Sequence, residues 1–201
     1  MLKKFHEAAL DEIYVPGSNE EVFSGRLLKV QRDHVTLPNG NDTTREYIRH
    51  PGAVAIVPVL ADGSVVLVKQ CRYPLATLLW EIPAGKLDEP GEPKVECAFR
   101  ELEEETGYRV ESPENLEYLM SLTTTVAFCD EAIDIFVAHN LIPSHQNLDE
   151  DEVINVVPCS LEELEDMVYT GKITDGKTIA AIMAYARKYR SEDKKDSMVR
   201  G

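Results

Sequence analysis

The sequence predicts an α/β protein in which a mixed sheet carries helices on its faces, with a small β unit at the N-terminal end. Strand-like and helix-like runs are mixed without the strict alternation of a doubly wound fold, and this favours such a layered arrangement. The chain has 201 residues, of which 43% are hydrophobic, so it can bury a sizeable core. No internal repeat or low-complexity segment interrupts this pattern.

The N-terminal segment, residues 1–48, is predicted to be the small β unit. Apolar and polar residues alternate over residues 28–37, as in half-buried strands. Residues 38–41 read Pro-Asn-Gly-Asn, a turn signal, and Tyr47 and Ile48 follow in a returning strand. A hairpin of this size is too small to be stable alone, so it is expected to pack against other protein.

Residues 49–190 are predicted to form the main domain, and residues 191–201 a flexible tail. The strands expected in the main domain are β-rich runs bounded by turn signals. They lie at 53–60, 64–70, 116–122, 132–138 and 153–158. Because no helix separates each strand from the next, the sheet is expected to be mixed.

Helical periodicity is clearest between Pro93 and Thr106. Its apolar residues follow the i, i+3, i+4, i+7 rule, Pro93 suits the first helical position, and Gly107 suits the position that ends a helix. Two further helices are expected, one at 161–169 behind a capping box and one at about 178–189.

The charge of the chain narrows the classes of partner. The formal net charge is −15, and such a surface repels phosphate backbones, so no nucleic-acid partner is expected. The longest apolar stretch, residues 53–61, is far too short to cross a bilayer, so no membrane partner is expected either. The N-terminus shows no apolar signal segment, and the four cysteines show no metal-ligand spacing. A cytoplasmic protein with reduced core thiols is therefore predicted.

A cluster of carboxylates lies on the predicted helix 93–106. At 100° per residue, Glu101, Glu104 and Glu105 gather on the side opposite the apolar face. Like charges one turn apart destabilise an isolated helix by about 0.2–0.5 kcal/mol per pair, and the helix C-terminus disfavours negative charge. Either these residues are a solvated helix face, or a divalent cation removes their repulsion. Hard carboxylate oxygens suit Mg²⁺, with Mn²⁺ as a possible substitute, rather than zinc.

The residues around this cluster form a longer pattern. Residues 100–108 read Arg-Glu-Leu-Glu-Glu-Glu-Thr-Gly-Tyr, with Gly85 and Glu92 upstream. This pattern resembles the Nudix box, although six residues rather than five separate Gly85 from Glu92. The extra residue lies in the loop 88–91, where an insertion costs little.

The resemblance extends beyond the box. The segments 49–55, 70–74 and 80–87 look like the flanks of ADP-ribose pyrophosphatases, and the likeness covers roughly residues 25–190. It implies a Nudix α/β/α sandwich preceded by a β unit that exchanges with a second subunit, and hence a homodimer.

The same resemblance implies roles for single residues. Glu101 and Glu105 are expected to be the main Mg²⁺ ligands, with Glu104 assisting and the Ala84 carbonyl oxygen as a backbone ligand. An acidic loop after the box supplies the base in the family. Here that loop is 148–152, with Glu150 expected as the general base and Glu152 as a ligand or alternate base, unless the loop is only an acidic surface turn. Substrate-binding roles fall on Arg49, Arg72, Glu81, Asp175 and Lys177, whereas Arg100 is expected to be structural.

The function implied is Mg²⁺-dependent hydrolysis of the pyrophosphate bond of a nucleoside diphosphate sugar, which gives a nucleoside monophosphate and a sugar phosphate. ADP-ribose is the first candidate. Asp175 and Lys177 resemble residues of relatives that act on hexose nucleotides such as GDP-mannose or ADP-glucose. The alternatives are a non-catalytic nucleotide-sugar sensor, which such retained box carboxylates argue against, and an enzyme for dinucleoside polyphosphates.

Overall fold

The computed structural model describes residues 15–88, 91–148 and 152–199, and the chain divides into two compact units. The N-terminal unit comprises Met1–His50 together with Thr125–Glu131, and the main unit comprises Pro51–Thr124 and Ala132–Gly201. The loop 125–131 from the middle of the chain thus belongs to the N-terminal unit, and the domain boundary at residue 48 stays a prediction.

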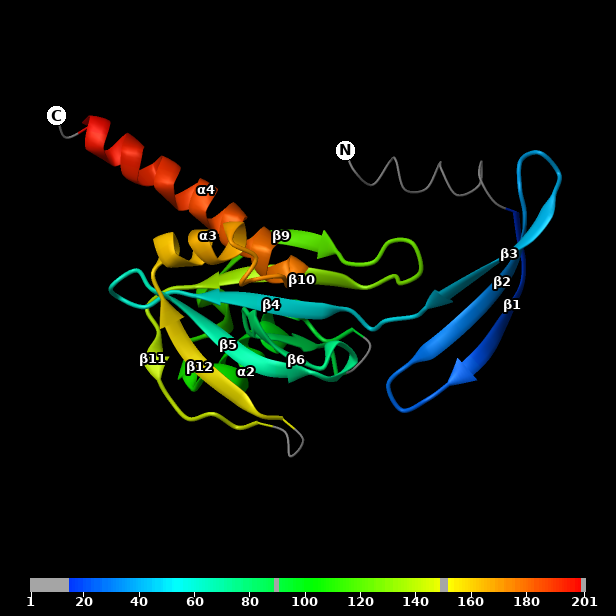
Figure 1. Ribbon diagram of the computed structural model, residues 1–201, viewed down its shortest axis with the longest axis horizontal. Coiled ribbons are helices and arrows are strands. Elements are labelled where there is room, and N and C mark those ends of the chain that lie inside the picture. Colours follow the sequence, from blue (N-terminus) through cyan, green and yellow to red (C-terminus); the bar gives the residue numbers. More distant parts are fainter. Residues whose placement is uncertain (1–14, 89–90, 149–151, 200–201) are drawn as a thin grey trace. The chain divides into compact units, whose positions relative to one another are not determined.

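The N-terminal unit is built on an antiparallel three-stranded sheet, ordered β1-β2-β3 (Figure 1). Its strands are β1 (Val15–Ser24), β2 (Lys29–Thr36) and β3 (Asp42–Ile48). The predicted hairpin corresponds to β2 and β3. The strand β1 was not predicted, because its sequence lacks alternation and its pairing with β2 shifts register twice.

The main unit contains a four-stranded sheet, ordered β7-β4-β10-β9, and a three-stranded sheet, ordered β12-β5-β6. The four-stranded sheet is mixed, as predicted, since β4 and β10 run parallel while its other neighbouring strands are antiparallel. The three-stranded sheet is antiparallel throughout. The five predicted strands are confirmed to within a few residues at each end. The strands are β4 (Ala53–Pro58), β5 (Val65–Arg72), β6 (Thr77–Glu81), β7 (Ala84–Lys86), β9 (Leu116–Thr123), β10 (Ala132–Ala138) and β12 (Ile154–Cys159).

Two hydrophobic cores lie on opposite faces of the four-stranded sheet. Successive side chains of a strand point to opposite faces, so Ala55 and Val57 of β4 join one core while Val54 and Ile56 join the other. The first core is covered by α3 (Leu161–Tyr169) and α4 (Gly176–Val199), and the second by α2 (Lys94–Thr106) (Figure 1). Helices on both faces of a mixed sheet make the predicted α/β/α sandwich.

The helix α2 forms where the periodicity predicted it. Ala98 and Leu102 of its apolar face are fully buried, and Val95 and Phe99 pack partly buried beside them. The helix starts at Lys94, so Pro93 lies just before the first helical position rather than in it. Gly107 ends the helix with a φ of 70°, a left-handed conformation that glycine adopts readily.

The last two helices differ in how well their ends were predicted. α3 matches its expected range, and the Ser160 side chain accepts a hydrogen bond from the Glu163 amide at its N-terminus. α4 continues to Val199, so the prediction that it ends near Tyr189 is wrong. The flexibility of residues 191–201 stays a prediction.

Four short elements complete the described part of the chain: η1 (Tyr73–Leu75), β8 (Tyr108–Arg109), η2 (Pro113–Asn115) and β11 (Ile142–Pro143).

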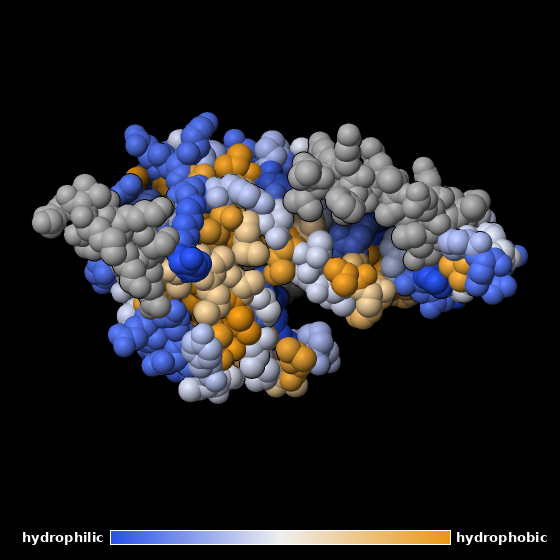
Figure 2. Space-filling view, turned by 90° about the horizontal axis from the view of Figure 1, so that it is seen from above, coloured by the Kyte–Doolittle hydropathy of each residue, from blue (hydrophilic) through white to orange (hydrophobic). Residues whose placement is uncertain are grey.

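The surface of the main unit combines hydrophilic residues with a gathering of hydrophobic ones on one face (Figure 2). No helix in the described ranges is long and apolar enough to cross a membrane. All four cysteines are free thiols. Cys97 and Cys159 are buried, as expected, but Cys71 is exposed and Cys129 half-buried, so the prediction that all four are core thiols is wrong.

Candidate active site

The carboxylate of Glu101 lies directly against the backbone of Gly85. A Cβ atom at Gly85 would lie 1.9 Å from Glu101 Cδ and 2.0 Å from its Oε1, far inside van der Waals contact. Only glycine therefore permits this approach between β7 and α2. The upstream glycine of the sequence pattern thus has a steric function, which is to let the helix carboxylate reach the strand.

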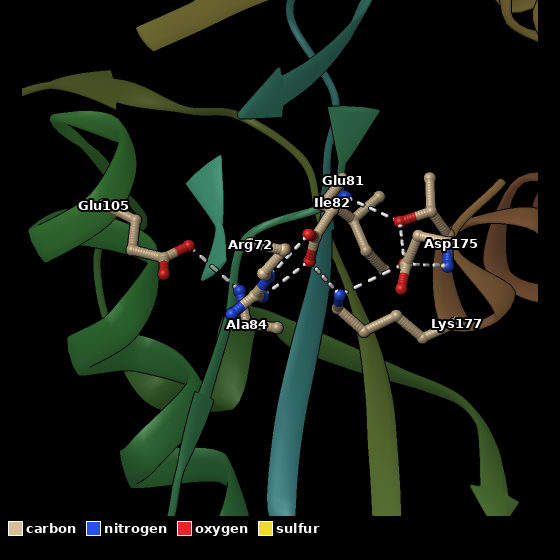
Figure 3. A network of polar contacts seen from close by, with 8 residues as sticks. Arg72, Glu81, Ile82, Ala84, Glu105, Asp175 and Lys177 are labelled. Atoms are coloured by element: carbon tan, nitrogen blue, oxygen red, sulfur yellow. Dashed lines mark hydrogen bonds and ion pairs between the residues drawn. The ribbon is translucent and has the colours of Figure 1, made fainter. Parts of the chain in front are cut away.

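The carboxylate of Glu105 is buried one turn further along α2. Its side chain is 3% exposed, and its Oε2 accepts a hydrogen bond of 3.0 Å from the Ala84 amide (Figure 3). Burial raises the pKa of Glu105 to about 8, and the charges of Glu101 and Glu152 add to that rise. Burial likewise raises the pKa of Glu101 to about 7. Both groups hold their protons unusually strongly, because nearby charges do not offset the loss of hydration.

Arg100 holds the remaining carboxylates of the box together. One guanidinium nitrogen lies 2.7 Å from Glu101 Oε1 and 2.9 Å from Glu104 Oε2, and the other lies 3.1 Å from Asp88 Oδ2 and 3.6 Å from Glu92 Oε1. The structural role expected for Arg100 is consistent with these pairs. Glu92 also accepts a hydrogen bond of 2.8 Å from the Asp88 amide, and the pairs of Asp88 and Glu92 with Arg100 tie the two ends of this loop to the helix.

The donor set of α2 and β7 fits a hard divalent cation. Within the residues that the structure describes, no three His, Cys, Asp or Glu side chains already form a cluster ready to hold an ion. The fit rests instead on two observations. The Glu105 carboxylate is deeply buried, and among the described residues its one hydrogen-bond donor is the Ala84 amide. The Gly85 backbone also leaves room for the Glu101 carboxylate. Carboxylate and carbonyl oxygens are ligands that Mg²⁺ prefers.

A second polar network lies on the other side of Ala84, around Glu81 at the end of β6 (Figure 3). Glu81 is 1% exposed and accepts hydrogen bonds from Arg72 Nε at 2.7 Å and Arg72 Nη2 at 2.6 Å. Lys177 of α4 donates to the same carboxylate and lies 3.1 Å from Asp175 Oδ2. Burial alone raises the pKa of Glu81, but the bonds from Arg72 and Lys177 outweigh it and hold that pKa below its usual value.

The start of α4 is joined to the strand end by Thr178. The Thr178 hydroxyl donates to Asp175 Oδ2 at 2.6 Å and accepts a hydrogen bond of 2.9 Å from the Ile82 amide. Asp175 Oδ2 also accepts from the Thr178 amide at 2.9 Å, so Asp175 acts as a helix cap. The sequence did not single out Thr178, because a threonine in the first turn of a helix is unremarkable there.

Eight of the predicted residues fall into two groups. Glu101, Glu104, Glu105 and Ala84 come together at α2 and β7. Arg72, Glu81, Asp175 and Lys177 come together in the second network, where each has a partner within the protein. Arg49 lies in the N-terminal unit, 2.9 Å from Asp130 Oδ2, and Glu150 lies outside the described residues. The substrate and catalytic roles of these residues stay predictions.

Comparisons with known proteins agree with this arrangement. The family profile described as NUDIX domain matches residues 49–182. The "Methanol dehydrogenase activator" of Bacillus methanolicus is 43% identical over 81% of this chain and 87% of the relative. The "ADP-ribose pyrophosphatase" of Bacillus subtilis (strain 168) is 40% identical over 82% of this chain and 88% of the relative. A crystal structure titled "ADP compounds hydrolase" has the same fold, with a TM-score of 0.78, 23% identity and coverage of 90% of this chain and 96% of that one.

Proposed function

The chain belongs to the NUDIX family and is a Nudix pyrophosphohydrolase, and we propose that it cuts the pyrophosphate bond of nucleoside diphosphate sugars, with ADP-ribose as the first substrate. The observation that carries the proposal is the pair of α2 carboxylates set against β7, the half-buried Glu101 at Gly85 and the buried Glu105 at the Ala84 amide. The similarity to an ADP-ribose pyrophosphatase at 40% identity supports the substrate class.

The same carboxylates are the proposed holders of a divalent cation, Mg²⁺ or Mn²⁺. Glu101 and Glu105 would bind it, with Glu104 and the Ala84 carbonyl oxygen as further ligands. When bound, the cation offsets the repulsion between the acidic site and the diphosphate and polarises phosphorus. Arg100 positions Glu101 and Glu104, because its guanidinium bridges their carboxylates in the structure.

The hydrolytic step needs a base and a cationic partner for the substrate. Glu150 is proposed to take the proton of the water that attacks phosphorus in line, with Glu152 as the alternate base. Glu152 lies close enough to raise the pKa of Glu105, which is consistent with a place beside the α2 carboxylates. Arg72 is proposed to contact the anionic substrate, since its side chain stays 41% exposed beside its pair with Glu81. The products from ADP-ribose are AMP and ribose 5-phosphate.

The proposed functional form is a homodimer in which N-terminal units are exchanged, in the cytoplasm. The large hydrophobic side chains exposed near β6, namely Tyr73, Leu75 and Leu78, support a second subunit on the main unit. Four free thiols, one of them exposed, suit a reducing compartment. Sedimentation of the full chain tests the dimer. A chain without residues 1–48 should be monomeric or aggregated, and a fully active monomer would contradict exchange.

A nucleotide-sugar panel tests the proposed function. The full chain is incubated with ADP-ribose, ADP-glucose, GDP-mannose and a dinucleoside polyphosphate, with Mg²⁺ or with EDTA, and phosphatase-released phosphate is measured. Release that requires Mg²⁺ and is fastest with ADP-ribose is expected. No Mg²⁺-dependent release from any nucleotide sugar would favour the sensor, and release from the dinucleoside polyphosphate alone would favour that second enzyme class.

A further inference from the structure

The backbone between β6 and β7 is fastened to three different elements. The Ile82 amide donates to the Thr178 hydroxyl of α4 at 2.9 Å, and the Pro83 carbonyl accepts from the Ile56 amide of β4 at 2.9 Å. The Ala84 amide then donates to Glu105 of α2 at 3.0 Å. Each of three successive residues thus has its own partner. The turn that carries Ala84 is therefore oriented by α4 on one side and by α2 on the other.

Helix capping alone does not account for Thr178. Capping needs only the bond from the Thr178 amide to Asp175 Oδ2. The Thr178 hydroxyl adds a bond to Asp175 and accepts one from Ile82, and both Thr178 and Ile82 are fully buried. A buried amide without a partner is strongly disfavoured, so losing this hydroxyl would force the Ile82 backbone to move.

A single residue, Pro83, separates Ile82 from Ala84. Since the φ of Pro83 is fixed, one backbone rotation fewer is available to absorb a shift of Ile82 before it reaches Ala84. From this geometry, we propose that Thr178, oriented by Asp175, is a positioning residue for the divalent-cation site, because it sets the place of the Ala84 backbone and through it of Glu105. This proposal rests on the proposed function and adds to it a residue on α4 that makes no contact with the α2 carboxylates in the structure.

The test measures Mn²⁺ binding to the full chain without substrate, by the loss of the free-ion electron paramagnetic resonance signal. Thr178→Val removes the hydroxyl at nearly constant shape, and Thr178→Ser keeps it. We expect the Mn²⁺ dissociation constant to rise about 10-fold or more in T178V, as for other residues that orient metal ligands, and to stay near the wild-type value in T178S. Thr170→Val is the matched control, because its hydroxyl bonds to Asp166 O at the exposed end of α3.

Circular dichroism and thermal unfolding establish that each variant is folded. If T178V does not fold, Asp175→Ser replaces it. Serine at position 175 still caps α4, but it cannot orient the Thr178 hydroxyl as the Asp175 carboxylate does. Wild-type Mn²⁺ affinity in a folded T178V or D175S chain overturns the proposal, as does an equal loss in T170V. If wild type binds Mn²⁺ but hydrolyses no nucleotide sugar, the proposed function fails, while the comparison of variants still decides the role of Thr178.

Discussion

Two carboxylates of the main unit, those of Glu81 and Glu105, are buried to nearly the same degree but differ in their hydrogen-bond partners and in their pKa values. Glu81 is 1% exposed and Glu105 is 3% exposed. Arg72 and Lys177 both donate to Glu81 and hold its pKa below the usual value, although burial acts against them. Among the residues that the structure describes, the one hydrogen-bond donor to Glu105 is the uncharged Ala84 amide, and burial raises the pKa of Glu105 to about 8.

The difference shows that the availability of a cation, not the depth of burial, decides the state of a buried acid in this protein. Around Glu81 the chain supplies its own cations, so this network is complete as it stands. Around Glu105 the charges of Glu101 and Glu152 disfavour ionisation further, and the charge of Lys177 favours it too weakly to offset burial. An arrangement of this kind gains from a cation that comes from solution.

Replacing the Glu105 carboxylate with an amide should have the largest effect, and this effect should fall on catalysis. Glu105→Gln should lower turnover of ADP-ribose about 100- to 1,000-fold, which is about 3–4 kcal/mol in the activation barrier. The glutamine oxygen can still accept from the Ala84 amide, so the melting temperature in EDTA should not fall. Glu96→Gln, on the exposed first turn of the same helix, is the control and should keep the wild-type rate. A near-normal rate in E105Q would refute the ligand assignment.

The same substitution at Glu81 should act on stability instead. Glu81→Gln leaves Arg72 and Lys177 without their buried partner and should lower the free energy of unfolding by about 3 kcal/mol in a urea titration. Glu46→Gln serves as control, because Glu46 pairs with Arg32 on the exposed N-terminal sheet, where a much smaller loss of stability is expected. Equal stability losses in the two variants would contradict the contrast drawn above.

The close approach of Glu101 to β7 can be blocked sterically. Gly85→Ala should lower turnover by about 10-fold or more, since the added Cβ must displace the Glu101 carboxylate. Gly176→Ala adds the same atom in open space and should leave turnover unchanged. If G85A turns over ADP-ribose like wild type, the position of Glu101 against Gly85 has no part in catalysis.

The pH dependence of stability should give the smallest effect. The pKa values of Glu101 and Glu105 are raised in the folded protein to about 7 and about 8. The stability that their protonated forms contribute is therefore complete below the pKa of glutamate in the unfolded chain. It is lost as the pH rises through about 7 to 8. Mg²⁺ competes with these protons and should raise the melting temperature more at about pH 9 than at about pH 6, by about 2–4 °C. Differential scanning calorimetry measures both shifts, and an equal Mg²⁺ effect at the two pH values would contradict the assignment.

The parts of the molecule that the sequence predicted well are those with a periodic or turn signal. The apolar repeat that includes Ala98 and Leu102 predicted the buried face of α2, and Gly107 its end. By contrast, β7 has only three residues, Ala84–Lys86, and owes its strand form to pairing with β4, which no local pattern reveals.

The second network was predicted only as separate substrate-binding residues. Arg72, Glu81 and Lys177 come from β5, β6 and α4, and their pairing depends on a tertiary arrangement that spacing along the chain does not contain. The role of Thr178 was not foreseen for the same reason, because its partner Ile82 is distant in sequence. The steric role of Gly85 was only implicit in the box pattern, which contains a glycine without saying what it touches.

The bond between Thr178 and Ile82 also has a consequence for biosynthesis. A nascent chain that has emerged only as far as α3 already carries every carboxylate of α2, but the residue that fastens the Ile82 amide has yet to leave the ribosome. Assembly of the site therefore waits for almost the whole polypeptide. Premature termination before Asp175 yields a protein with all the α2 carboxylates and a turn beside them that lacks its bond from Ile82 to α4.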